Sequence, residues 1–212
     1  MENKATELVF ILDKSGSMSG MEQDTIGGFN AMIEKQKKQE GVAYVSTFLF
    51  SNHTTTLHDR KPLSEIQPLT EKDYQVGGCT ALLDALGIAI AHISTIHKYA
   101  RTEDVPQNTM FVITTDGMEN ASIQYASEQI KALIREKEAL GWNFLFVAAN
   151  IDAVSTAESI GIQKEHAANY CVAEDTEAVY QEVCESISSF RECGTLASDW
   201  GIKLEKRLKR RK

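Results

Sequence analysis

Two continuous apolar runs that end in polar residues constrain the fold of this chain more than any other feature. The first run, Leu8–Leu12, leads into an Asp-x-Ser-x-Ser sequence that begins at Asp13. The second run, Met110–Ile113, leads into Thr-Asp-Gly at residues 115–117. A continuous apolar run is typical of a parallel strand that helices cover on both faces. Two buried strands are therefore expected to end in side chains that carry oxygen atoms.

Strand-like and helix-like segments alternate along the chain. The expected strands are Leu8–Leu12, Val42–Phe50, Thr54–Leu57, Met110–Thr115, Trp142–Ala149 and Ala168–Val172. The expected helices are Met21–Gln39, Thr80–Tyr99, Gln124–Leu140, Asp152–Ile160 and Thr176–Arg191, and Thr80 and Asp152 are expected N-caps. This alternation favours an α/β fold with a doubly wound, mostly parallel sheet and helices on both faces. Thr54–Leu57 follows a Ser-Asn turn and is expected to form one antiparallel edge strand.

Length and charge favour one domain with a distinct tail. The 212 residues, 42% of them hydrophobic, suit a single domain, which we place at residues 1–202. Residues 203–212 contain seven of the 22 basic residues and one of the 30 acidic residues, so this tail carries +6 and the remainder −14. A short basic terminus is more often a solvated segment than a binding site.

The expected compartment is the cytoplasm. No stretch approaches the roughly 20 apolar residues that cross a bilayer, and the first residues lack the pattern of a secretory signal. The four cysteines form no Cys-x-x-Cys pair, which fits a reducing environment.

The expected topology places the polar strand ends together. In an open α/β sheet, ligands bind beyond the carboxyl ends of the strands, where the strand order reverses. Asp13 ends the first strand and Asp116 follows the fourth, so their carboxylates should lie side by side. Thr80 follows a Gly-Gly-Cys turn and adds a hydroxyl at a helix start. Carboxylates and hydroxyls suit a hard divalent ion such as Mg2+.

Asp-x-Ser-x-Ser, an isolated threonine and Thr-Asp-Gly, in this order, resemble the metal-ion-dependent adhesion site (MIDAS) of the von Willebrand factor type A (VWA) family. The resemblance covers about Thr6 to Ser189 and implies a Rossmann-like VWA fold with a complete MIDAS. Met18 and Asn120 match the Ser-Met and Asp-Gly-x-x-Asn extensions of the motif.

The resemblance implies a role for each motif residue. The metal residues would be Asp13, Ser15, Ser17, Thr80 and Asp116. In the family, the serines contact the ion directly, the threonine contacts it directly or through water, and the aspartates act largely through water. The implied ion is Mg2+, with Mn2+ or Ca2+ as substitutes, and a partner protein supplies a further Asp or Glu ligand.

A rim of loop residues is expected around this site because each follows the carboxyl end of an expected strand. The candidates for partner binding are Met18, Ser19, Glu119, Asn120, Asn150 and Asp152.

The leading hypothesis is therefore a cytoplasmic protein-binding adaptor, not an enzyme. The resemblance implies a place in a stress-resistance or ATPase-associated assembly. One alternative is a Mg2+-dependent phosphohydrolase with Asp13 as nucleophile, although Ser15 stands where such enzymes carry a second aspartate. Another is a nucleic-acid-associated factor that binds through the tail, although the acidic body repels phosphate and the tail has no aromatic residue.

Overall fold

A six-stranded sheet forms the centre of the computed structural model, which describes residues 5–149, 151–170, 172–197 and 200. The strands are β1 (Thr6–Asp13), β2 (Ala43–Phe50), β3 (Thr54–Pro62), β4 (Asn108–Thr115), β5 (Trp142–Ala149) and β6 (Ala167–Tyr170). Their order is β3-β2-β1-β4-β5-β6, and only the β2–β3 pair is antiparallel among the described strands. The predicted mostly parallel sheet with one antiparallel edge strand is confirmed.

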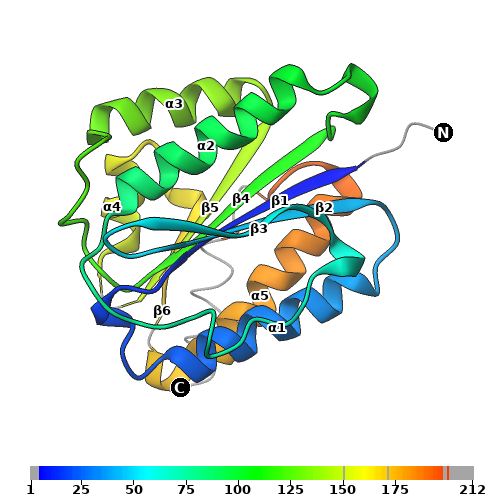
Figure 1. Cartoon of the computed structure of the whole chain (residues 1–212). Coiled ribbons are helices and arrows are strands. Elements are labelled where there is room, and N and C mark those ends of the chain that lie inside the picture. The colour runs from blue at the N-terminus through cyan, green and yellow to red at the C-terminus, as the bar shows by residue number, and fades with distance from the viewer. Residues whose placement is uncertain (1–4, 150, 171, 198–199, 201–212) are drawn as a thin grey trace.

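Helices cover both faces of the sheet (Figure 1). The helices are α1 (Glu22–Lys37), α2 (Leu82–Tyr99), α3 (Ser127–Ala139), α4 (Ala153–Ser159) and α5 (Val172–Cys193). Helices α1 and α5 lie on one face, and α2, α3 and α4 lie on the other. Alternate residues of β1 point to opposite faces of the sheet. Phe10 packs in the core on the α1 and α5 face, and Ile11 packs in the core on the face that α2, α3 and α4 cover. Both faces are buried, which explains why the strand is apolar at every position from Leu8 to Leu12.

Close packing and a buried arginine join α5 to α1. A Cβ atom added to Gly28 would lie 2.3 Å from the Tyr180 ring, so only glycine permits this approach of the two helices. Near the end of α5, the Arg191 guanidinium donates hydrogen bonds to the carbonyls of Gln36, Glu40 and Gly41. These carbonyls lie at or beyond the end of α1, where they have few partners within the helix.

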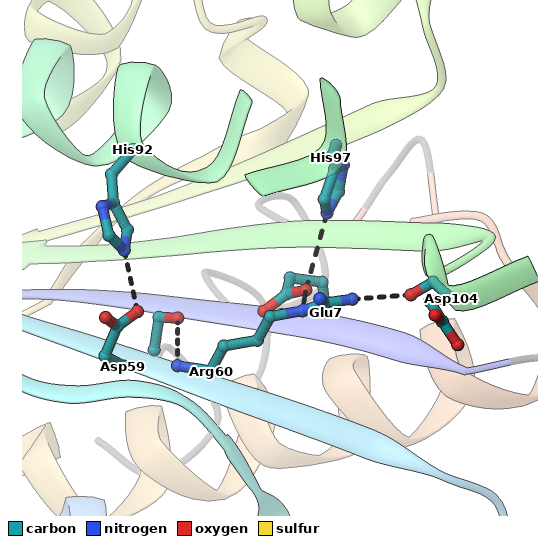
Figure 2. Close-up of polar contacts among 7 residues, drawn as sticks. Glu7, Asp59, Arg60, His92, His97 and Asp104 are labelled. Carbon is teal, nitrogen blue, oxygen red and sulfur yellow. Dashed lines mark hydrogen bonds and ion pairs between the residues drawn. The ribbon is translucent and has the colours of Figure 1, made fainter. Parts of the chain in front are cut away.

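A buried ion pair lies near the amino end of β1, at the opposite end of this strand from Asp13 (Figure 2). The fully buried Glu7 carboxylate accepts a hydrogen bond of 3.0 Å from Nε of Arg60 and lies 3.5 Å from Nε2 of His97. The Arg60 guanidinium also donates to the Asp104 carbonyl at 2.7 Å. Arg60 has a φ of 45°, beside a bulge in the β2–β3 pair, so the strand bends where this side chain reaches Glu7.

Several element boundaries differ from the predicted ones. β3 extends to Pro62 instead of ending at Leu57, α3 begins at Ser127 instead of Gln124, and α5 begins at Val172 instead of Thr176. The predicted cap at Asp152 is confirmed, because its side chain accepts a hydrogen bond from the Ser155 N–H. The predicted cap at Thr80 is wrong, since Ala81 occupies the N-cap position of α2.

Among the described residues, no helix combines the length and apolarity needed to cross a membrane. The basic tail at residues 203–212 lies outside the described residues, so the domain boundary that we place at 202 stays a prediction.

Candidate metal centre

The carboxyl ends of β1 and β4 lie side by side at the point where the strand order reverses. Leu12 pairs with Thr114 in the parallel register of the two strands, so Asp13 and Thr115 follow as neighbours. Ser15 and Ser17 lie just beyond β1, around a short 3-10 helix at Gly16–Met18. This is the location at which open α/β sheets bind ligands.

Three hydroxyl groups converge there from two segments far apart in the sequence. Ser15 Oγ lies 2.9 Å from Ser17 Oγ, and Thr80 Oγ1 donates a hydrogen bond of 3.0 Å to Ser15 Oγ. Gly117, which follows β4, lies against two of these hydroxyls. A Cβ atom added to it would lie 2.6 Å from Thr80 Oγ1 and 2.8 Å from Ser17 Oγ. Any side chain at position 117 would therefore enter the space between these hydroxyls.

The turn that carries Thr80 is held by backbone contacts with the loop after β1. Gly16 N–H donates to the Gly78 carbonyl, and Gly77 N–H donates to the Lys14 carbonyl, both at 2.8 Å. Gly78 has a φ of 84°, a conformation that glycine adopts without strain. The two loops are thus one hydrogen-bonded unit, and Thr80 is placed by long-range contacts instead of by helix capping.

Asp13 is fully buried, and both of its carboxylate oxygens accept hydrogen bonds. Oδ1 accepts from Ser15 N–H at 2.7 Å, and Oδ2 accepts from Thr115 Oγ1 at 2.5 Å. Burial raises the pKa of Asp13, and the nearby charge of Asp116 raises it further, while the hydrogen bonds from Thr115 and Ser15 oppose the rise. Two buried carboxylates within electrostatic reach of each other favour the binding of a cation.

The donor set fits a hard divalent ion. In an octahedral Mg2+ complex with metal–oxygen bonds of about 2.1 Å, neighbouring ligand oxygens lie about 3 Å apart. The hydroxyl pairs Ser15–Ser17 and Ser15–Thr80 are separated by 2.9 and 3.0 Å. Among the described residues, no group of three His, Cys, Asp or Glu side chains is arranged to hold a metal. Any cation at this centre would therefore depend on hydroxyl ligands in addition to Asp13 and Asp116.

The rim residues differ in what their side chains do. Ser19 is exposed, whereas Met18 is only 2% exposed and belongs to the buried core cluster on the α1 and α5 face, and contact of either residue with a partner stays a prediction. Asn120 Oδ1 accepts from Thr80 N–H at 3.0 Å, which helps to place the Thr80 hydroxyl. Asp152 is exposed but caps α4. Asn150 lies outside the described residues.

Glu119 belongs to the framework of the site. Its carboxylate accepts hydrogen bonds from the N–H groups of Leu83, Ala121 and Ser122, at distances of 2.8–2.9 Å. The Ser122 hydroxyl donates a further bond of 2.8 Å to the same carboxylate. Glu119 therefore joins the loop after β4 to the first turn of α2.

Two supporting residues were not predicted as part of the site. Thr115 donates to Asp13, and the Tyr74 hydroxyl donates to the backbone carbonyl of Asp13. Thr115 lies within the Thr-Asp-Gly motif, so its position was a signal for a role next to Asp116. Tyr74 comes from a loop with no motif, and only the folded structure brings it to β1.

These features define the class: a doubly wound α/β domain with a candidate oxygen-ligand metal centre at the switch point of its sheet. A family model described as VWA domain containing CoxE-like protein matches residues 1–153. The chain belongs to this family of VWA domains. It has no significant match among curated protein sequences.

Solved structures with low sequence identity share the fold. The vWF domain of the type V pili tip protein Mfa5 from Porphyromonas gingivalis has a TM-score of 0.66 and 10% identity, over 91% of this chain and 98% of that chain. An aerotolerance-related membrane protein from Bacteroides fragilis has a TM-score of 0.52 and 15% identity, over 87% of this chain and 99% of that chain.

A third similar structure is proximal thread matrix protein 1 from the mussel byssus, with a zinc-occupied MIDAS motif. Its TM-score is 0.55 and its identity 15%, over 84% of this chain. The match covers 46% of the mussel chain, so this chain spans about half the length of that protein. At these identities, the similarity shows the fold alone.

Proposed function

We propose that this chain is a metal-dependent adaptor module that binds Mg2+ at its MIDAS and uses the ion to bind an acidic side chain of a partner protein. Ser15, Ser17 and Thr80 would hold the ion, and Asp13 and Asp116 would bind it directly or through water. The observation that carries this proposal is the convergence of the three hydroxyls beside two buried carboxylates. When bound, Mg2+ would supply a coordination position for one further carboxylate oxygen.

We also propose that the module has no enzymatic activity. A phosphoryl-transfer nucleophile must reach its substrate, but the Asp13 carboxylate is fully buried and both of its oxygens accept hydrogen bonds. Mg2+-dependent turnover of a generic phosphomonoester that is lost in Asp13→Asn would contradict this part of the proposal.

A cytoplasmic location within a stress-resistance or ATPase-associated assembly completes the proposal. Cys79, Cys184 and Cys193 are free thiols, which is compatible with a reducing compartment. The assembly rests on the family resemblance, and its members are to be identified by experiment.

The direct experiment is affinity capture from a cell extract with the full chain as bait. We expect a partner that is retained in Mg2+, released by a chelator and not retained by Ser17→Ala. Ser64→Ala is the control, because Ser64 is an exposed serine that follows Pro62 near the amino end of β2, away from the candidate centre, and has no predicted role in partner binding. A partner captured equally with and without chelator would contradict a metal-dependent function.

A further inference from the structure

The loop that follows Gly117 begins next to the candidate metal centre and presents two large apolar side chains to solvent. Met118 is 72% exposed and Ile123 is 91% exposed. Met118 comes two residues after Asp116, so it lies at most about 7 Å along the chain from that carboxylate residue. Three other large apolar side chains are exposed among the described residues: Val42, Tyr99 and Leu140. They precede β2, β4 and β5, so they lie toward the amino ends of the parallel strands, away from the candidate centre.

Single exposed apolar residues are common on protein surfaces and need no explanation. What distinguishes this pair is the framework that holds it. Asp84, which is 5% exposed, accepts hydrogen bonds from the N–H groups of Ile123, Gln124 and Tyr125, at 2.9–3.0 Å. Its own N–H donates to the Ser122 hydroxyl at 3.1 Å.

The first half of the same loop is held in the same manner. Glu119 accepts from the N–H groups of Ala121 and Ser122, and Asn120 exchanges backbone and side-chain hydrogen bonds of 3.0 Å with Thr80. At the far end, the Tyr125 ring packs so closely on α2 that a Cβ added to Gly87 would lie 2.5 Å from it.

The loop is therefore fixed through its backbone, and its apolar side chains are not needed to hold it. A surface that is already ordered loses little conformational entropy when a partner binds. The net charge of −14 on residues 1–202 would also repel an acidic partner, so a contact that does not depend on charge would add to its affinity.

We infer that Met118 and Ile123 form an apolar contact surface for the partner's acidic segment, so that the ligand is a carboxylate flanked by bulky apolar residues. This inference rests on the proposed function, because the carboxylate is the group that would reach the metal. Met118 contacts the residue next to the carboxylate, and Ile123 contacts a residue further along the same segment.

The test uses labelled synthetic peptides and the full chain, with binding followed by fluorescence polarisation in Mg2+ and in chelator. One peptide carries a single aspartate flanked by leucines, a second has serines in place of the leucines, and a third has asparagine in place of the aspartate. The proteins are the wild type, the double variant Met118→Ser/Ile123→Ser, and Leu140→Ser. Leu140 is a matched control, since it is 67% exposed and precedes the amino end of β5, away from the candidate centre.

We expect the leucine-flanked aspartate peptide to bind the wild type about tenfold more tightly than the serine-flanked peptide, in Mg2+ only. The double variant should lose this preference, and Leu140→Ser should keep it. Equal affinity for the two aspartate peptides, or the same preference in the double variant, would overturn the inference. No Mg2+-dependent binding of the leucine-flanked peptide at millimolar concentration would also overturn it.

Two controls distinguish the apolar contact surface from the carboxylate contact and from the metal centre. If the aspartate and asparagine peptides bind equally, the proposed function fails, whereas carboxylate-dependent binding without a flank preference refutes only the apolar surface. Mg2+ titration of the double variant provides the second control: a metal affinity that falls as much as the peptide affinity would assign the loss to the metal centre and overturn the inference. A wild-type dimer in analytical ultracentrifugation that the double variant dissociates would overturn it too, because a second copy would then be the occupant.

Discussion

At the scale of single residues, the candidate centre depends on buried hydrogen bonds as well as on the proposed ligands. The Thr115 hydroxyl donates to Asp13 and accepts from Gly117 N–H at 3.1 Å, so it joins the ends of β1 and β4. We expect Thr115→Val to lower the free energy of unfolding by about 1–3 kcal/mol, because it leaves a buried carboxylate oxygen without its donor. Urea unfolding measures this change. Thr115→Ser, which keeps the hydroxyl, should lose much less, and equal losses would contradict the role of the bond.

His58 makes stability depend on pH. It is buried on β3, with Nδ1 3.1 Å from the Thr47 hydroxyl, and burial followed by the charge of Lys61 lowers its pKa below the usual 6.5. The unfolded chain then binds a proton at a higher pH than the folded chain does. The contribution of His58 is therefore complete above about pH 6.5 and is lost as the pH falls toward the lowered pKa.

We expect His58→Gln to lose less stability than the wild type when the pH falls from about 7 to about 5. The measurement is urea unfolding of both proteins at both pH values. Parallel losses in the two proteins would show that other groups control the acid sensitivity.

Residue-level prediction from the sequence succeeded where a motif places side chains at strand ends. The structure brings the hydroxyls of Ser15, Ser17 and Thr80 together, and their role as metal ligands stays a prediction. The sequence did not indicate the burial of Met18, since an apolar residue that follows a strand gives no local sign of whether it turns into the core. The sequence does contain a signal for Asp84, because a lone acidic residue in the apolar first turns of a helix needs hydrogen-bond partners if it is buried.

At the scale of elements, the contact between α1 and α5 can be tested with two adjacent glycines. A Cβ at Gly28 would meet the Tyr180 ring at 2.3 Å, whereas a Cβ at Gly27 would have no atom within 4 Å. We expect Gly28→Ala to lower the free energy of unfolding by about 1–3 kcal/mol through overpacking. Gly27→Ala should raise it by about 0.5–1 kcal/mol, because alanine favours a helix. Thermal or urea unfolding measures both changes. A change of the same sign in the free energy of unfolding of the two variants would contradict this packing.

The buried ion pair of Glu7 and Arg60 and the exposed ion pair of Arg101 and Asp104 should differ in their contribution to stability. Arg60→Ala would leave the fully buried Glu7 carboxylate without its guanidinium (Figure 2). We expect a loss of about 3–5 kcal/mol in the free energy of unfolding. Arg101→Ala removes an exposed ion pair with Asp104 and should change stability by less than about 1 kcal/mol. Comparable losses in the two variants would contradict a buried role for Arg60.

Element boundaries were less predictable than element types because long-range contacts decide them. Ala126 has the extended backbone of an N-cap, with φ −89° and ψ 156°, and its N–H bonds to the Gln129 side chain, so α3 begins at Ser127 and not at Gln124 as its sequence suggests. The N–H groups of Leu83 and Asp84 in the first turn of α2 bond to the side chains of Glu119 and Ser122, so these residues take the place that Thr80 was expected to fill. β3 continues past Leu57 through the bulge at Arg60, and a positive φ at an arginine is not a feature that sequence patterns indicate.

At the scale of the whole molecule, residues as far apart in the sequence as Asp13 and Gly117 meet at the carboxyl ends of the central strands. Metal binding would therefore be linked to folding. A ligand that binds the folded state at a concentration about 100 times its Kd raises the free energy of unfolding by about 2.7 kcal/mol. The strand order that creates this edge was predictable from the alternation of strands and helices. The supporting contacts of Tyr74 and Asp84 were not, because they join segments with no shared sequence pattern.

Titration calorimetry of Mg2+ into the metal-free full chain tests the central claim most directly. We expect saturable binding at one site in the wild type and an affinity at least about tenfold weaker in Ser17→Ala, with Ser19→Ala unchanged. The melting temperature of the wild type should rise with Mg2+ or Mn2+ in parallel. No binding heat and no thermal shift with either ion, or equal binding by wild type and Ser17→Ala, would contradict a metal centre built from these hydroxyls.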